Sequence, residues 1–246
     1  MIHLFWHGDE LPEVNRRCVA SAVRHHDVVV LWCYHAPPRG LPDGVEVRSA
    51  EALLPRAEVD AALAAGARIE HVSDAVRFAA LAAHGGWWLD CDVLVLRPLP
   101  AGDRHIMTVA RRLIGPYARK HPMYTADDGD PNISVLRLPP ADPLAVRMAA
   151  FTRAHMVSSK WTTNMMTFAK HVRELGYLEH VRPARWFAPL PAPGRATTRM
   201  LRAEPYSWFG WRVPSRDEIA ADPACYCVDL HGRLKHHGLE VHDALV

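Results

Sequence analysis

The sequence predicts an α/β protein with a mostly parallel sheet. Residues 27–33 are predicted to be a strand, and after Asp27 they form a continuous apolar run, which is typical of a strand covered on both faces of its sheet. Over the first hundred residues the patterns follow the order strand, helix, strand, strand, helix, helix, strand. Ligands of such sheets gather at the carboxyl ends of the strands, so we expect a binding site at that edge.

The N-terminal elements are short and well separated. Pro12 suits the first turn of a helix, and a loop rich in Pro and Gly at 35–44 separates the second strand from the third. The predicted elements are a strand at 2–6, a helix from 12 to about 26, strands at 27–33 and 45–48, and a helical region at 50–66.

Residues 70–99 are the centre of the chain: a helix, a glycine turn and a buried strand. Alanines and valines at helical spacing predict the helix, and Gly85 and Gly86 end it. Asp74 and Arg77 are three residues apart on this helix, so they share one of its faces.

The strand after the glycines carries two acids inside an apolar run. Residues 87–96 are predicted to be extended, so the carboxylates of Asp90 and Asp92 point to the same side and Cys91 points into the core. Burying two carboxylates is costly unless a cation or hydrogen-bond donors meet them. A divalent metal that also binds diphosphate oxygens meets this need. The alternative is an ordinary surface turn, which the apolar surroundings disfavour.

Together these residues resemble a known family. Ser73, Asp74 and Arg77, followed by the run from Gly85 to Asp92, resemble the sugar-binding Asp-X-Asp region of glycosyltransferase family 32. That family includes yeast initiating mannosyltransferases, α-1,4-galactosyltransferases and bacterial capsule enzymes. The region is shared with large clostridial glucosylating toxins. The opening segment 2–8 resembles the family's first strand, which meets the nucleotide.

The resemblance implies a fold and a separate role for each half of the chain. It implies a single GT-A-like domain over 1–246, with a mostly parallel Rossmann-like sheet flanked by helices. Residues 1–100 would be the nucleotide-sugar-binding half, and residues 101–246 the acceptor-side half. A region smaller than the sheet and its helices would lie on the acceptor side.

The resemblance also implies roles for individual residues. The metal, Mn²⁺ or Mg²⁺, would be held by Asp92, Asp90 and His231. The expected catalytic residues are Asp74, Arg77, Asp90 and Asp92. The residues expected to contact the nucleoside-diphosphate sugar are Phe5, Trp6, His7, Ser73, Asp74, Arg77, Asp90 and Asn132. For the Trp6 side chain, a base platform and a core position are equally open.

The second half of the chain has a weaker pattern. An acidic loop at 124–132 either contacts the sugar or acceptor or is a solvated turn, with Asn132 favoured for a role. The aromatic segment 182–215 is predicted to be irregular, and either binds sugar or covers the core. Thr163 and Asn164 stand where the family usually has Thr-Gly-Pro. The predicted elements are strands at 106–110, 133–138 and 226–231, and helices at 142–157 and 161–175.

Composition indicates an ordinary globular enzyme. With 246 residues and 49% hydrophobic content, the chain can bury a substantial core. Five cysteines form no paired framework, which favours a reducing compartment. No apolar run approaches the roughly 20 residues of a membrane span, and the chain enters a strand directly, so we expect a cytoplasmic protein without a signal peptide.

The sequence therefore predicts a metal-dependent, retaining glycosyltransferase. It would move a hexosyl group from a UDP- or GDP-sugar to a hydroxyl of a glycan, lipid or other acceptor, as in polysaccharide biosynthesis. Two alternatives remain open. The net charge is −4 over residues 1–100 and +6 over 101–246, so a nucleic acid such as hydroxylated phage DNA is one alternative acceptor. The other is a non-catalytic nucleotide-sugar-binding protein, which the intact Asp90 and Asp92 disfavour.

Overall fold

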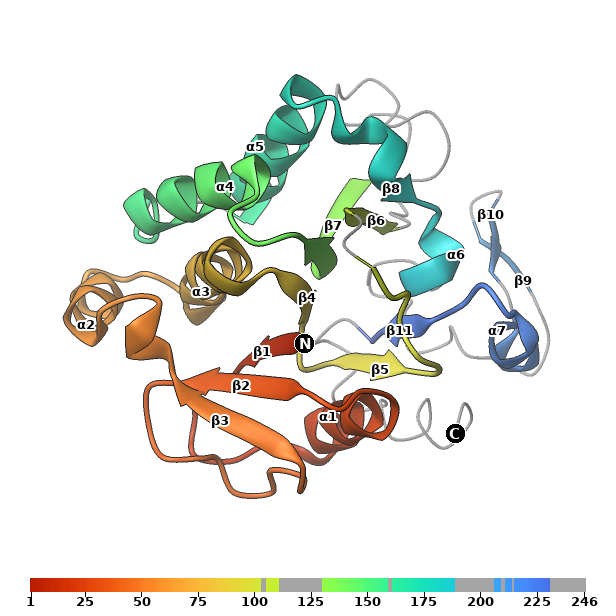
Figure 1. Cartoon of the computed structure of the whole chain (residues 1–246), viewed down its shortest axis with the longest axis horizontal. Coiled ribbons are helices and arrows are strands. Elements are labelled where there is room, and N and C mark those ends of the chain that lie inside the picture. Colours follow the sequence, from red (N-terminus) through yellow and green to blue (C-terminus); the bar gives the residue numbers. More distant parts are fainter. Residues whose placement is uncertain are drawn as a thin grey trace.

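A seven-stranded sheet forms the centre of the protein (Figure 1). The computed structural model describes residues 1–102, 105–110, 130–158, 161–188, 206–208, 211–213 and 215–230. The strands of the sheet are β1 (Ile2–Phe5), β2 (Val29–Cys33), β3 (Val45–Ser49), β4 (Gly86–Leu89), β6 (Ile106–Ala110), β7 (Asp130–Leu138) and β8 (Val181–Arg182). Their order in space is β3-β2-β1-β4-β7-β6-β8.

All but one of these strands run in the same direction. β1 pairs in parallel with β2 and β4, β2 with β3, and β6 with β8. β7 is antiparallel to both of its neighbours, β4 and β6. The predicted α/β class with a mostly parallel sheet is confirmed. Because β7 is reversed, its first residues lie at the edge where β1 and β4 end.

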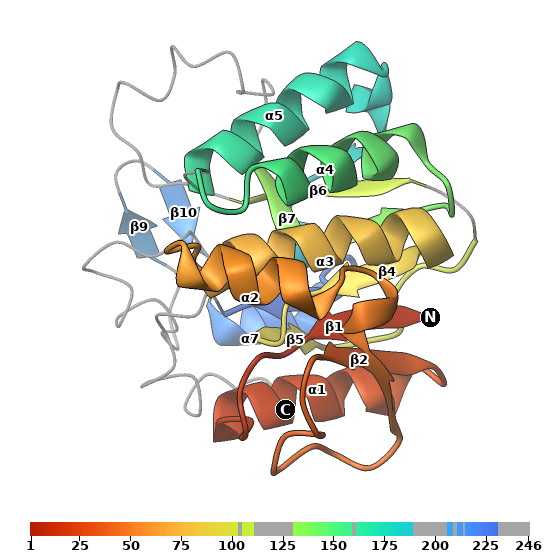
Figure 2. The ribbon, with the colours of Figure 1, turned by 90° about the vertical axis from the view of Figure 1, so that its left-hand side faces the viewer.

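Helices cover both faces of the sheet. One face carries α2 (Arg56–Ala64), α3 (Ile69–His84), α4 (Pro143–Ala154) and α5 (Trp161–Glu174), with α3, α4 and α5 side by side in Figure 2. The other face carries α1 (Glu13–His25), α6 (Ala184–Phe187) and α7 (Arg216–Ala221) (Figure 1). None of the described helices has the length and apolar character that crossing a bilayer requires.

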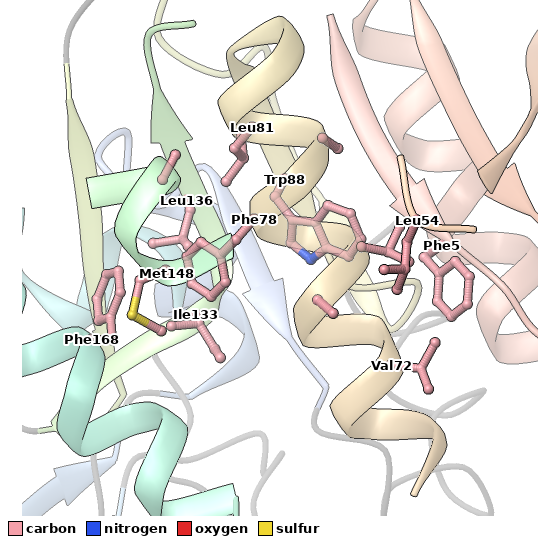
Figure 3. Packing of buried hydrophobic residues seen from close by; sticks show 14 of the residues in the cluster. Phe5, Leu54, Val72, Phe78, Leu81, Trp88, Ile133, Leu136, Met148 and Phe168 are labelled. Atoms are coloured by element: carbon pink, nitrogen blue, oxygen red, sulfur yellow. The ribbon is translucent and has the colours of Figure 1, made fainter. Parts of the chain in front are cut away.

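Each face of the sheet has its own apolar cluster. On the α3 side, Trp88 and Phe78 are almost fully buried, and Phe78 lies 6.0 Å from Phe168 of α5 between ring centroids (Figure 3). On the α1 side, Trp87 packs with Phe187, their ring centroids 5.8 Å apart. Successive residues of β4 therefore point into opposite clusters, as the period of a strand requires.

The glycine turn after α3 is confirmed at Gly85, directly after the last helical residue. Gly85 has a φ of 61°, and a Cβ placed on it would lie 2.4 Å from the backbone nitrogen of Pro140. A side chain cannot fit at that distance, and the positive φ itself favours glycine. The close approach lets β4 begin only two residues after the last residue of α3.

The prediction of one extended strand over 87–96 is wrong. β4 ends at Leu89, and the amide of Val93 donates to the carbonyl of Asp90 across 3.0 Å, which closes a turn over Asp90 to Asp92. The chain then leaves the main sheet as β5 (Val93–Val95), which pairs antiparallel with β11 (Cys227–Asp229). The turn is held by contacts distant in sequence: Asn15 Nδ2 donates to the Cys91 carbonyl at 3.2 Å.

Other sequence predictions hold in outline. The helical region at 50–66 is a 3-10 turn, η1 (Ala50–Ala52), followed by α2. The segment 182–215 is only partly described and contains short pieces in place of a continuous loop. They include β8, α6, β9 (Tyr206–Trp208) and β10 (Trp211–Val213), and η3 (Tyr177–His180) precedes them. The part of the acidic loop at 124–129 lies outside the described residues.

Candidate active site

One arginine joins the helix α3 to the first acid of the turn. Arg77 donates from Nη1 to Asp74 Oδ1 and from Nη2 to Asp90 Oδ1, each across 2.7 Å. The guanidinium is buried, with 4% of its side chain exposed. Two charge-assisted hydrogen bonds from one planar group fix its orientation. Asp74, Arg77 and Asp90, which the family resemblance grouped, therefore lie together at the carboxyl end of β4.

Trp88 contacts both Arg77 and Asp90. Its Nε1 donates to the same oxygen, Asp90 Oδ1, at 2.8 Å. The central carbon of the Arg77 guanidinium lies 5.2 Å from the centroid of the Trp88 ring, within cation–π range. Trp88 points toward α3 because it alternates with Trp87 on the strand. The Asp90 carboxylate is thus held by two donors, yet a third of its side chain is exposed.

The other oxygen of Asp74 is held by the helix α5. Asn164 Nδ2 donates to Asp74 Oδ2 at 2.6 Å. Both Asp74 and Asn164 are buried, so this contact joins α3 to α5 inside the protein. Burial raises the pKa of Asp74, and the charge of Arg77 opposes that effect. Ser73 next to it is half-buried on α3.

A second polar group lies at the start of β7. Asp229 Oδ2 accepts hydrogen bonds from Asn132 Nδ2, at 3.0 Å, and from the Ser134 hydroxyl. Asn132 Oδ1 accepts from the Ser134 amide at 2.9 Å. The Ser134 carbonyl in turn accepts from the amide of Asp90 at 2.9 Å. Asn132 is therefore connected to Asp90 through one residue, Ser134.

The carboxylates create an excess of negative charge. Desolvation raises the pKa of Asp90; the nearby charge of Arg77 opposes this, and those of Asp229 and Asp74 add to it. When all are ionised, these three acids and Arg77 together carry a net charge of two negative units. Such a group favours binding of a cation or of hydrogen-bond donors.

Asp92 is the last residue before β5, and its backbone contacts the end of β11. Its carbonyl accepts from the amide of Leu230 at 3.0 Å, and its side chain is half-buried. Its charge adds to burial in raising the pKa of the Cys18 thiol, which belongs to α1. Because Asp90 and Asp92 belong to a turn and not to a strand, the alternation of a strand does not fix the relative direction of their carboxylates. Cys91 is buried, as expected.

Of the three metal ligands expected from the sequence, the structure describes Asp90 and Asp92. Among the described residues, no group of three or more His, Cys, Asp or Glu side chains is arranged to hold a metal ion. His231 lies outside the described residues, directly after Leu230. Asp90 and Asp92 supply hard oxygen ligands, which fit a divalent cation in chemical type.

The end of β1 lies against the turn. Cys91 Sγ donates to the carbonyl of Phe5 at 3.3 Å. The Phe5 ring is buried, 6.1 Å from the Tyr34 ring, so this side chain belongs to the core. Trp6 is half-buried, and its Nε1 is buried with no hydrogen-bond partner among the described residues. His7 is exposed, with its ring 5.4 Å from that of His35.

Sequence reasoning missed four groups of this site. They are the N–H of Trp88, the hydroxyl of Ser134, the amide of Asn164 and the carboxylate of Asp229. Asp229 had the clearest signal, because it is an acid within an apolar strand, as Asp90 and Asp92 are. The other three act through contacts that depend on side-chain direction, so spacing alone does not reveal them.

Comparisons with known proteins address the identity of this site. The family described as "Glycosyltransferase sugar-binding region containing DXD motif" matches residues 47–111. No curated protein matches the chain. Among solved structures, the chain matches one titled "PaToxG Glycosyltransferase", with a TM-score of 0.49 and 13% sequence identity over 71% of this chain and 68% of that one. The matched residues 47–111 include Asp74, Arg77, Asp90 and Asp92, so the match covers the Arg77 contacts and the turn that follows β4.

Proposed function

We propose that the protein is a metal-dependent, retaining glycosyltransferase that moves a hexosyl group from a UDP- or GDP-sugar to a hydroxyl of a glycan or lipid acceptor. The observation that carries this proposal is the bridge from Arg77 to Asp74 and Asp90 at the carboxyl end of β4. The bridge lies within the sugar-binding region and beside the end of β1. Ligands of α/β sheets bind at this edge.

The acids of the bridge bind the donor sugar in this proposal. Asp90 keeps a third of its side chain exposed while Arg77 and Trp88 fix one of its oxygens. A carboxylate held in this way is pre-organised to accept hydrogen bonds from ribose or sugar hydroxyls. Asp74 is almost fully buried, so its part is mainly to orient Arg77.

The nucleotide lies along the ends of β1 and β2 in this proposal. Trp6 Nε1 is a buried donor without a partner among the described residues, and such a group gains by meeting a ligand acceptor. His7 and His35 are exposed beside it and offer further donors. Phe5 contributes through its backbone, since its ring is part of the core.

The residues of the turn fit a divalent cation. Asp92, with Asp90 and His231, would hold Mn²⁺ or Mg²⁺, and the excess negative charge of the surrounding acids supports this assignment. When bound, the ion supplies Lewis-acid stabilisation of the leaving diphosphate. Retention of the anomeric configuration is proposed from the family resemblance, and NMR of the transfer product tests it.

A donor panel tests the proposed function. UDP- and GDP-sugars are incubated with the protein and Mn²⁺, and both hydrolysis and thermal unfolding are measured. The cognate donor should raise stability by about 2.7 kcal/mol when present at a hundredfold excess over its dissociation constant. If no donor of either class is hydrolysed or stabilises the protein, with or without Mn²⁺, the proposal is wrong.

A further inference from the structure

The turn that carries Asp90 and Asp92 is also the joint between two sheets. β4 before the turn belongs to the seven-stranded sheet, and β5 after it pairs only with β11 among the described strands. In Figure 1 the pair β5–β11 lies beside the end of β4. The orientation of the two acids therefore depends on how firmly the small sheet is held against the large one.

One carboxylate spans this joint. Asp229 is the last residue of β11 and pairs with Val93, the first residue of β5. Its Oδ2 accepts from Asn132 and Ser134, which both belong to β7 in the large sheet. The side chain of Asp229 thus ties β11, the partner of the strand that follows the turn, to β7 of the large sheet.

The backbone closes a ring around the turn. On one side, the amide of Asp90 donates to the carbonyl of Ser134 at 2.9 Å. On the other, the amide of Leu230 donates to the carbonyl of Asp92 at 3.0 Å. Ser134 and Leu230 are in turn connected through Asp229. Both ends of the turn are therefore anchored to the same carboxylate.

We propose that Asp229 is a positioning residue that holds the Asp90–Asp92 turn in place for glycosyl transfer. It is 2% exposed, so it acts through the turn and does not touch a substrate. A buried carboxylate is costly, and here its hydrogen bonds join two strands that have no other strand pairing with each other in the described sheets. The activity measurement below rests on the proposed function, whereas the exchange measurement does not.

Asp229→Asn is the main test, because it keeps the size of the side chain and removes its charge. Hydrogen exchange is measured at the amides of Asp90 and Leu230, and donor hydrolysis is measured under the same conditions. We expect exchange at both amides to be faster by roughly tenfold or more, as for a locally loosened segment. We expect kcat to fall by about tenfold with KM little changed, since positioning of the acids matters most in the transition state.

Asp142→Asn is the matched control. Asp142 is also buried and accepts three hydrogen bonds, from His105, Tyr177 and the amide of Leu144, but it caps α4 away from the turn. Asp142→Asn should leave kcat and the exchange rates of the Asp90 and Leu230 amides unchanged, even if it lowers the melting temperature. Should Asp229→Asn fail to fold, Ser134→Ala takes its place, because it removes the hydrogen bond from the Ser134 hydroxyl to Asp229 Oδ2.

The outcomes separate this inference from the function. Unchanged exchange at Asp90 and Leu230 in the folded variant overturns the role of Asp229, as does an equal effect of Asp142→Asn. Faster exchange with unchanged kcat also overturns it, because the turn would then not need to be held for the reaction. If the wild-type protein hydrolyses no donor, the proposed function fails, and the exchange result alone decides whether Asp229 holds the turn.

Discussion

Arg77 and Asp90 lie 13 residues apart in the chain and are joined by an ion pair of 2.7 Å. The pair spans the glycine turn, so that a buried helix residue orients an acid at the edge of the sheet. Asp74 and Trp88 complete the arrangement from either side. The structure therefore holds Asp90 before any ligand arrives, which is what a pre-organised site requires.

Arg77→Lys tests the bridge. Lysine keeps the charge but cannot donate to two carboxylates in a planar fork, so one of the acids loses its partner. A lost hydrogen bond to a charged group is worth about 1.5–3 kcal/mol, so we expect donor hydrolysis to fall roughly tenfold or more. Steady-state kinetics of purified protein measure the effect.

A surface arginine provides the control for this variant. Arg153 makes two hydrogen bonds to Glu58, but this pair is exposed between α4 and α2. Exposed pairs contribute about 0–1 kcal/mol, so Arg153→Lys should change neither activity nor stability appreciably. Equal activity of the two variants would contradict the importance of the bridge.

Trp88→Phe removes the N–H donor to Asp90 and keeps an aromatic ring near Arg77. We expect weaker binding of the cognate donor, by roughly tenfold, because the carboxylate is then held by one donor in place of two. Calorimetric titration measures the dissociation constant. Trp32→Phe is the comparison, since Trp32 is also almost fully buried, donates to His3 Nδ1 at 3.1 Å and has its ring against His3 and His84, not against Asp90. Donor affinity that falls as much in Trp32→Phe would refute the prediction.

The free energy of unfolding should depend on pH through His3. Its Nδ1 accepts from Trp32 and its Nε2 donates to the Gly85 carbonyl at 2.9 Å, so the ring is held neutral. Burial lowers the pKa of His3 from 6.5 to about 4. Between these values the unfolded chain binds a proton that the folded protein does not, so stability falls as the pH falls. The contribution of His3 is fully present above pH 6.5 and is lost down to about pH 4, a change of about 3 kcal/mol.

Urea unfolding between pH 4 and pH 7 measures this contribution. His3→Gln should lower the free energy of unfolding at pH 7 and flatten its dependence on pH. Other histidines, such as His26, also have lowered pKa values, so the difference between wild type and variant is the relevant quantity. Identical pH slopes for both proteins would show that His3 titrates normally.

Much of the fold follows from local signals in the sequence. The helix that ends at Gly85 follows from alanine-rich periodicity and paired glycines, and the buried strand β2 from its continuous apolar run. The grouping of Asp74, Arg77 and Asp90 follows from helical spacing together with the family resemblance. These features depend on near neighbours in the chain, which is why a pattern reveals them.

The turn at Asp90 to Asp92 did not follow from the pattern. Its apolar flanks resemble one strand, but Val93 onward pairs with residues near 228 and not with the main sheet. The contacts of Asp229 likewise join residues more than ninety positions apart, and the reversed β7 pairs with β4 across 46 to 52 positions. Such pairings are set by the packing of whole elements, so periodicity cannot specify them.

The central claim is that Asp92 serves a metal-dependent transfer of a sugar. The most direct measurement compares wild type with Asp92→Asn in donor hydrolysis, with Mn²⁺ and with EDTA, alongside Asp217→Asn as an exposed-acid control on α7. The account predicts that Mn²⁺ accelerates hydrolysis by wild type and by Asp217→Asn, and that Asp92→Asn shows no metal-dependent turnover. Full activity of Asp92→Asn in the presence of EDTA would contradict it.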